Sequence, residues 1–406
     1  ENDIIDREAA DRSTSVYLVD RVVPMLPEIL SNEVCSLKAD VDRFCYSVIL
    51  EINEKSEILS HQIKKTVIHS DKRFTYQEAQ DIIDSGKGLF SNELLILNKL
   101  SKILRKKRFS SGSINFDRQE VKFILDKDNN PTDVFFKESI DTNHLIEEFM
   151  LMANKIVAKE IGFVKKGEKE KTFVYRVHDK PDEDKINSLN NIIKKFGYSI
   201  NQTSPKNLST SLNTLLKNVK GKSESNMIET LTIRSMSKAI YTTNNIGHYG
   251  LNFNYYSHFT SPIRRYPDLI VHRLLEKYLS GEKSVEKNKI EDICKYTSEK
   301  EKDAAMAERD SIKYMQTKFL QDKVGGVFDG VISGVTEWGI YVELEKNKCE
   351  GLVRISSIKG DFYVFDKNTY SIIGRSSKNK YQLGDKVKIK IKNTDLERKQ
   401  IDFILV

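Results

Sequence analysis

Two adjacent arginines, Arg264 and Arg265, stand in the stretch HFTSPIRRYPDLIVHR, residues 258–273. An arginine side chain presents a rigid fork of N–H donors that matches the oxygens of a phosphate group. A fixed cation of this kind lowers a reaction barrier when negative charge develops on those oxygens. The alternative is that both arginines pair with surface carboxylates, and charge alone favours it because such ion pairs are common. The stretch therefore raises the hypothesis of a phosphate-binding site.

Other kinds of catalytic chemistry have little support in the sequence. His248, His258 and His272 lie in one region, but their spacings of ten and fourteen residues do not resemble a metal-binding histidine pair. We expect these histidines to form hydrogen bonds within the fold. The sequence contains no G-x-S-x-G turn and no glycine-rich phosphate loop. A serine nucleophile and the use of nucleoside triphosphates are both disfavoured.

The composition is that of a globular protein with a moderate basic excess. The 406 residues are too many for one ordinary core, so two or more domains are expected. The net charge of +7 and the pI near 8.9 hint at a polyanionic partner. Four scattered cysteines without a C-x-x-C pair indicate free thiols in a reducing compartment, and we expect a cytoplasmic location. No apolar run reaches the ~18 residues of a membrane span.

Helices and short strands are both expected before residue 322. Residues 41–53 are rich in β-branched and aromatic side chains and predict a strand. A helix should begin after Thr75 and end at Gly86. Residues 114–136 predict a hairpin with its turn in DKDNNP. Further helices are predicted at 94–107, 144–162, 182–197, 227–241, 268–279 and 286–320.

The helix predicted at 144–162 carries apolar side chains at helical spacing, which we expect to form its buried face. These side chains are Ile146, Phe149, Met150, Ala153 and Val157.

The composition changes near Val324, where short strands begin to alternate with turns. In the segment KVKIKIK, apolar and lysine residues alternate with a period of two, so Val387, Ile389 and Ile391 should face inward. Five short strands in about 80 residues predict a small closed barrel of the OB type. The five candidates are 326–335, 338–345, 350–356, 385–393 and 400–406.

Several segments resemble the RNB ribonucleases, the RNase II and RNase R family, and they occur in the family's order. TSPIRRYPD is closer to RNase R than to RNase II, and the barrel is similar to the RNA-binding OB domain of ribosomal protein S-one. The resemblance covers essentially the whole chain. Its other segments are DREAADRSTSVYLVDRVVPMLPEILSNEVCSL, SGSINFD, LIEEFMLMAN, FVYRVHDKP, IRSMSKAIY, HYGLNFNYYSHF and MAERD.

The resemblance implies an α+β fold with two domains. The RNB nuclease domain, a mixed sheet surrounded by helices, would occupy residues 1–322 and lack its N-terminal part. An OB-type barrel would occupy residues 323–406. The implied activity is hydrolytic, processive 3′→5′ digestion of single-stranded RNA to nucleoside 5′-monophosphates, with magnesium as the cofactor. We expect a monomer that does not bind membranes.

The resemblance also assigns roles to individual residues. Arg264 would contact the scissile phosphate, and Tyr17 would orient or stack on the 3′-terminal nucleotide. Glu308 matches a glutamate close to that nucleotide, although a glutamate on a highly charged helix is usually solvated. Phe116 matches an aromatic clamp at the other end of the bound RNA segment, with core packing as the alternative. Arg265 is a further RNA-binding candidate that has a structural alternative.

Further RNA-binding candidates lie outside this segment. Arg234 is a helical arginine that could line an RNA channel or form an ion pair. The barrel carries aromatic residues that could stack on bases and an arginine that could meet the backbone, although one or two of these rings could belong to the barrel core. These residues are Trp338, Tyr341, Phe362 and Arg354.

The metal ligands that the resemblance implies are not found in this sequence. The family's aspartate cluster lies upstream of the DREA segment, so we expect the ligand aspartates upstream of Glu1 and no metal ligand within the chain. The acidic run at 181–184 is typical of a first helical turn, and no D-x-D-D-like run exists. We therefore expect an N-terminally truncated protein that binds RNA but cleaves it poorly or not at all.

Two other classes of protein remain as alternatives. One is a catalytically inactive RNA-binding member of the same family, in which the natural protein would lack the aspartates too. The other is a translation-associated protein that uses only the barrel, and the segment TSPIRRYPD argues against it. The residues upstream of Glu1 would distinguish an active nuclease from an inactive family member.

Overall fold

The computed structural model describes residues 1–115, 120–164, 167, 169–222, 224–366, 369 and 371–406. The N-terminal segment forms short elements around the start of the chain. Strand β1 pairs antiparallel with β2, and the longer strands β3 and β4 form a second antiparallel ribbon. The bounds are α1 Ile4–Arg12, β1 Val16–Tyr17, β2 Val22–Val23, the π-helix η1 Ile29–Val34, β3 Asp42–Ile52 and β4 Ile58–His69.

Local sequence signals predicted the next elements correctly. Helix α2 begins after Thr75, whose side chain accepts a hydrogen bond from the N–H of Glu78 in a capping box, and it ends at Gly86 in the left-handed conformation. The predicted hairpin is present as β5 and β6, with its turn at 126–130. The bounds are α2 Tyr76–Ser85, α3 Ser91–Ser111, β5 Glu120–Leu125, β6 Pro131–Lys137 and α4 Asp141–Gly162.

The buried face of α4 matches the prediction only in part, since Val157 is fully buried as predicted. Ile146 is 42% exposed, whereas Glu148 is only 4% exposed. Helix α3 packs against α4 and brings Arg108 to Glu148, where the Nε of Arg108 donates to Oε1 at 3.0 Å. The buried face of α4 therefore includes a charged residue that the apolar pattern alone does not predict.

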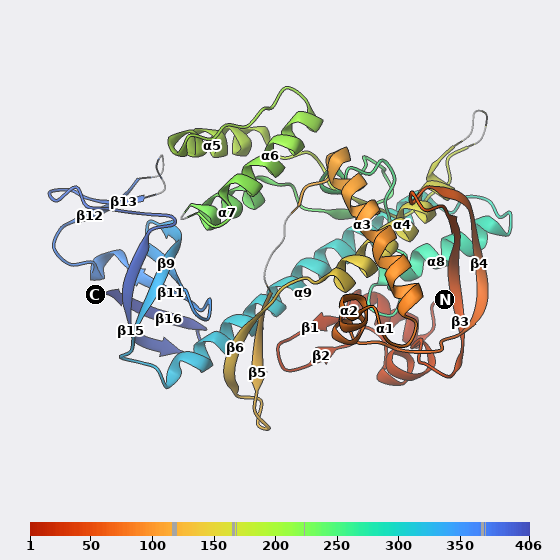
Figure 1. Ribbon diagram of the computed structural model, residues 1–406, viewed down its shortest axis with the longest axis horizontal. Helices are drawn as coiled ribbons and strands as arrows, with labels where there is room; N and C mark the ends of the chain where they lie inside the picture. The colour runs from red at the N-terminus through yellow and green to blue at the C-terminus, as the bar shows by residue number, and fades with distance from the viewer. Residues whose placement is uncertain (116–119, 165–166, 168, 223, 367–368, 370) are drawn as a thin grey trace.

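The rest of the part before the barrel is mostly helical. Strands β7 and β8 pair antiparallel, and within the described residues the strands before the barrel pair two by two. Helix α9 has 35 residues: its N-terminal part packs against β8, its middle contacts β1, and its C-terminal end reaches the barrel (Figure 1). The bounds are β7 Tyr175–Val177, α5 Glu183–Ile193, η2 Lys194–Phe196, α6 Pro205–Val219, α7 Ser225–Ser235, β8 Ile240–Thr242, η3 Tyr249–Leu251, α8 Tyr266–Leu279 and α9 Lys287–Gln321.

The C-terminal part forms the closed five-stranded barrel that the strand pattern predicted, in the order β10-β11-β16-β15-β9. Ile389 and Ile391 are fully buried in β15, while the lysines beside them are exposed. A three-stranded sheet, β12-β13-β14, was not predicted. The bounds are β9 Val327–Thr336, β10 Gly339–Leu344, β11 Glu350–Arg354, η4 Ile355–Ser357, β12 Tyr363–Asp366, β13 Ser371–Gly374, β14 Lys380–Gln382, β15 Lys386–Asp395 and β16 Gln400–Leu405.

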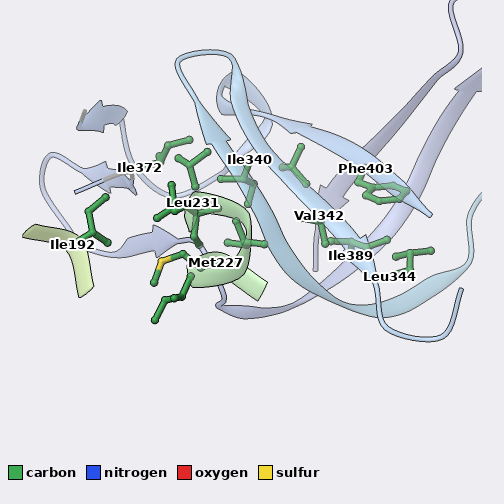
Figure 2. Close-up of a cluster of buried hydrophobic side chains, with 14 of the residues drawn as sticks. Ile192, Met227, Leu231, Ile340, Val342, Leu344, Ile372, Ile389 and Phe403 are labelled. Atoms are coloured by element: carbon green, nitrogen blue, oxygen red, sulfur yellow. The ribbon is translucent and has the colours of Figure 1, made fainter. Parts of the chain in front are cut away.

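Two hydrophobic cores hold the molecule together. One lies under α8 and the β7–β8 pair and includes Val271 and Leu275, both fully buried. The other is continuous from the helices α5–α7 into the barrel. Figure 2 shows Met227 and Leu231 of α7 beside Ile340 of the barrel. The shared core therefore anchors the barrel to these helices. Across the described ranges, no helix is both long enough and apolar enough to cross a membrane.

Candidate RNA-binding and catalytic site

The candidate site is built where two distant segments of the chain pair. Thr14 and Arg265 form an antiparallel bridge. The backbone N–H of Ser15 donates to the carbonyl of Arg264 at 3.0 Å, and the N–H of Tyr266 donates to the carbonyl of Ser13 at 2.8 Å. This pairing places Arg264 opposite Ser15, two residues before Tyr17, although the sequence separates the two segments by about 250 residues.

Helix α9 brings Glu308 to the same place. The backbone N–H of Tyr17 donates to Oε1 of Glu308 at 3.0 Å, and the N–H of Val19 donates to the hydroxyl of Ser311 at 3.0 Å. Tyr17 remains 47% exposed, so its ring does not lie in the core. The segments that carry Arg264, Tyr17 and Glu308 thus meet, while Ser311 is a supporting residue that the sequence did not single out.

The two adjacent arginines have different environments. The guanidinium of Arg265 donates from Nε and Nη2 to the two oxygens of Asp268, each at 2.8 Å. Asp268 is fully buried and also accepts from the N–H of Ser261 at 2.8 Å. Burial disfavours the charge on Arg265, but the facing Asp268 carboxylate outweighs this cost, and the pKa of Arg265 is raised. Arg265 therefore fixes the turn before α8; its contact with RNA stays a prediction.

Arg264 has no such partner. Its side chain is half-buried, and among the described residues none forms an ion pair or a hydrogen bond with its guanidinium. Its backbone carbonyl accepts from Ser15 and from the hydroxyl of Thr14 at 3.2 Å, which holds the residue in place. A held guanidinium without a carboxylate is suited to bind an anion. The signal that could have separated the two arginines is Asp268, three residues after Arg265 in the first turn of a helix.

A layer of buried rings lies behind this turn. The hydroxyl of Tyr241 and Nδ1 of His258 are 2.8 Å apart, and the guanidinium of Arg176 lies 4.6 Å from the Tyr241 ring centre. Burial, together with the charges of Arg265 and Arg176, lowers the pKa of His258 well below its usual value. Burial also lowers the pKa of His248 to about 3. Both side chains form hydrogen bonds within the fold, as the sequence predicted, and their lowered pKa values keep them neutral.

Because of these buried histidines, we expect the free energy of unfolding to decrease as the pH falls from 6.5 towards 5. The unfolded chain binds protons at histidine near pH 6.5, whereas folded His248 and His258 stay neutral. The unfolded state therefore binds more protons in this window, and unfolding becomes easier by up to about 1.4 kcal/mol per pH unit for each histidine. Denaturant titrations at pH 7.5, 6.0 and 5.0 measure the effect, which His248→Gln should reduce. Constant or rising stability on acidification would contradict it.

Two candidates outside the barrel remain. Arg234 is exposed in the last turn of α7, the helix whose apolar side packs towards the barrel core. Phe116 lies outside the described residues. Their predicted contacts with RNA stay predictions.

The barrel brings two of its four candidates, Tyr341 and Arg354, to one face. Ile340 and Val342 are fully buried, so Tyr341 between them points outward, opposite Gly334 and Leu352. A Cβ at Gly334 would lie 3.3 Å from the Tyr341 ring, so the glycine leaves space for it. Tyr341 and Arg354 lie on the same face of β10 and β11, and Trp338 is exposed in the turn before β10. Arg354 pairs in register with Gly339, next to Trp338, which is 69% exposed.

Phe362 stands on the segment before β12 and has a partner that the sequence did not reveal. Its ring is 64% exposed, and the guanidinium carbon of Arg375 lies 4.6 Å from the ring centre. The N–H of Arg375 donates to the carbonyl of Phe362 at 2.9 Å. An aromatic ring stacked with an arginine is a suitable platform for a base. Phe362 and Arg375 are thirteen positions apart and flank strands that were not predicted, so no local sequence pattern indicates their contact.

The described residues do not fit the magnesium site that the resemblance implies. In this part of the chain, no group of three or more histidine, cysteine, aspartate or glutamate side chains could hold a metal ion. The two buried aspartates near the turn are already engaged. Asp268 binds Arg265, and Asp6 accepts from Arg273 at 2.7 Å and from the hydroxyl of Tyr266 at 3.0 Å.

Glu1, the residue upstream of which the ligand aspartates are expected, is itself engaged with basic groups. Its carboxylate oxygens lie 4.0 Å from Nε of Arg273 and 3.8 Å from Nζ of Lys277, both on α8. An acidic side chain that faces two cations is placed as an ion-pair partner, and Glu1 belongs to no metal-binding group among the described residues. The structure thus gives Glu1 no role as a metal ligand, and the position of the aspartates upstream of it stays a prediction.

Comparison with known families identifies the two domains. The RNB domain family matches residues 1–281 of the sequence, and the S1 RNA binding domain family matches residues 321–405. The chain therefore belongs to the RNB ribonuclease family, and the resemblance drawn from the sequence is confirmed. The α+β fold with a C-terminal OB-type barrel is confirmed as well. Most of α9 lies between the two matched ranges.

The curated relatives with high similarity are named Ribonuclease R. The protein of Aquifex aeolicus (strain VF5) is 36% identical over 416 residues, which cover 99% of this chain and 57% of that protein. The protein of Escherichia coli (strain K12) is 35% identical over 423 residues, which cover 99% of this chain and 51% of that protein. The chain thus spans little more than half the length of these relatives.

Solved structures show the same architecture. The apo form of Mycoplasma genitalium RNase R matches with a TM-score of 0.92 and 28% identity, covering 100% of this chain and 64% of that one. The same enzyme in complex with ribose methylated single-stranded RNA matches equally, with a TM-score of 0.92. Yeast Ssd1, described as a pseudonuclease, is 20% identical with a TM-score of 0.71, covers 92% of this chain and 46% of that one, and shares the fold alone.

Proposed function

We propose that this chain is the RNB and S1 part of a hydrolytic 3′→5′ exoribonuclease. Its substrate is single-stranded RNA, which it degrades processively to nucleoside 5′-monophosphates. The proposal rests on one observation: the segments that hold Arg264, Tyr17 and Glu308 meet in the fold. Among the described residues, no carboxylate forms an ion pair with the guanidinium of Arg264. The Ribonuclease R names of relatives at 35–36% identity support the same activity.

The roles of the three residues follow from their environments. The Arg264 fork binds the oxygens of the scissile phosphate and offsets the charge that develops there. The exposed Tyr17 ring stacks on the 3′-terminal nucleotide without selecting a base. Glu308 holds the Tyr17 backbone and lies close to that nucleotide. Magnesium, when bound by the whole enzyme, activates water for phosphodiester hydrolysis.

No step through the metal is assigned to this chain, because the described residues provide no site for it. We therefore propose that the chain alone binds RNA and cleaves it poorly or not at all. We further propose that the protein acts as a monomer in the cytoplasm. Its four cysteines are free thiols, which is consistent with a reducing compartment.

The activity is tested with 3′-end-labelled and internally labelled single-stranded RNA in the presence of magnesium. This chain is compared with a version extended beyond Glu1 by its own coding sequence. Release of mononucleotides from the extended version alone is expected. Release by this chain alone would contradict the account of the metal, and RNA binding without release by either version would favour a catalytically inactive family member.

The barrel face predicts a separate effect on binding. Trp338→Ala should weaken the binding of single-stranded RNA by about 1–3 kcal/mol, because a stacking surface for one base is lost. Fluorescence anisotropy at fixed salt measures the change. Phe44→Ala on β3 is the matched control, since Phe44 is also an exposed aromatic, at 92%, but lies in the β3–β4 ribbon. Equal affinities for the Trp338 variant and the unmodified chain would exclude Trp338 from the RNA-binding face.

A further inference from the structure

A cavity of about 870 Å³ opens between α3, α4 and β4, and none of the candidate-site residues lines it. Its volume lies within the usual range for small-molecule sites. Basic side chains enter it from all three elements. They are Lys107 and Arg108 of α3, Lys155 and Lys159 of α4, and His61 of β4.

Three of these basic groups already have partners in the fold. Arg108 is bound to the buried Glu148, and His61 lies 3.1 Å from Glu160. Lys107 donates to the carbonyl of Lys55 at 2.6 Å. These contacts hold the walls of the cavity in place. The other two basic residues of the cavity are Lys155 and Lys159.

Among the described basic residues that line the cavity, Lys155 and Lys159 have no hydrogen-bond or ion-pair partner for their side chains. They stand one helical turn apart on α4, so both ammonium groups are close to the same part of the cavity. Burial of its ammonium, together with the charge of Lys159, lowers the pKa of Lys155, although the residue as a whole has a large exposed area. Two like charges held together in this way are relieved by a bound anion.

Apolar and aromatic surface completes the cavity. The ammonium of Lys155 lies 5.0 Å from the ring centre of Phe253, and the ring of Phe163 lines the cavity as well. Met152 and Ile156 provide aliphatic surface. A ligand that matches this set is an anion attached to a flat, partly apolar group.

We propose that this cavity binds a phosphorylated nucleoside, with the phosphate at Lys155 and Lys159 and the base against Phe253 or Phe163. The site is separate from the one formed by Tyr17, Arg264 and Glu308. The same chemistry has two sources, a free mononucleotide or one nucleotide of an RNA strand that passes over α4.

The test measures binding to the 406-residue chain, which carries the whole cavity. Adenosine 5′-monophosphate, adenosine and a short single-stranded RNA are titrated by isothermal calorimetry or by a fluorescent analogue. The chain is compared with Lys155→Met and Lys159→Met, which remove the charge and keep the apolar stem. Lys99→Met, an exposed lysine of α3 outside the cavity, is the matched control, and thermal melting checks that each variant folds.

We expect the monophosphate to bind more tightly than adenosine and each cavity variant to weaken its binding at least tenfold, with Lys99→Met unchanged. If RNA binding alone weakens in the cavity variants, the occupant is a nucleotide of the strand, and the site is still supported. Monophosphate and RNA binding that are unchanged in both variants would overturn the proposal. Loss of monophosphate binding in Arg264→Met alone would also overturn it, because the nucleotide would then occupy the candidate site.

Discussion

Replacing Arg264 by methionine is expected to lower the rate of RNA hydrolysis by about two to three orders of magnitude while RNA binding changes little. The reason is that the Arg264 guanidinium has no carboxylate among the described residues, so its charge is available to a phosphate. A cation that acts mainly on the charge developing during hydrolysis affects turnover more than affinity. Single-turnover kinetics on labelled RNA, with the N-terminally extended protein and magnesium, measure this effect.

The control for this substitution is Arg73→Met. Arg73 is exposed before α2 and forms no ion pair with a described residue, so its loss removes an equal charge without touching the site. Turnover should be unchanged in this variant. If Arg264→Met also leaves turnover unchanged while the RNA stays bound, Arg264 does not contact the scissile phosphate.

The neighbouring arginine should behave in the opposite way. Arg265→Met is expected to lower the free energy of unfolding by about 3–5 kcal/mol, because it leaves the buried Asp268 carboxylate without its partner. Thermal and denaturant unfolding of the 406-residue chain measure this loss. Asp268→Asn combined with Arg265→Met removes the unpaired charge and should recover part of the stability. A change of only about 0.5 kcal/mol, typical of a surface substitution, would show that the pair does not fix this turn.

Local signals in the sequence predicted the elements whose structure depends on near neighbours. Thr75 and Gly86 mark both ends of α2, because capping involves residues within one turn. The period of two in KVKIKIK predicted which side of β15 is buried, since a strand alternates its faces. Both effects depend on residues that are close together in the sequence, so a short segment is enough to predict them.

Effects that depend on distant partners were missed. Glu148 is buried on α4 because Arg108 reaches it from α3, and an apolar pattern within α4 contains no sign of this pair. Asp361, two residues before β12, accepts hydrogen bonds from the N–H groups of Ser376 and Ser377, which follow β13. Neither contact follows from spacing.

In the candidate site too, the sequence predicted local features and missed contacts between distant residues. The donor geometry of arginine raised the hypothesis of a phosphate-binding group at 264–265, and the fold shows that Asp268 takes Arg265 and leaves Arg264. The link between Tyr17 and Glu308 joins residues 291 positions apart and came from family resemblance, not from the residues themselves. The structure then supplied the backbone pairing that explains why these segments meet.

The most direct test of the central claim is a structure of this chain bound to a short single-stranded RNA. We predict that the guanidinium of Arg264 lies about 2.7–2.9 Å from oxygens of the phosphate before the 3′-terminal nucleotide. The ring of Tyr17 should lie against that nucleotide. A complex in which the 3′ end occupies another groove, with Arg264 and Tyr17 both free of RNA, would contradict the claim.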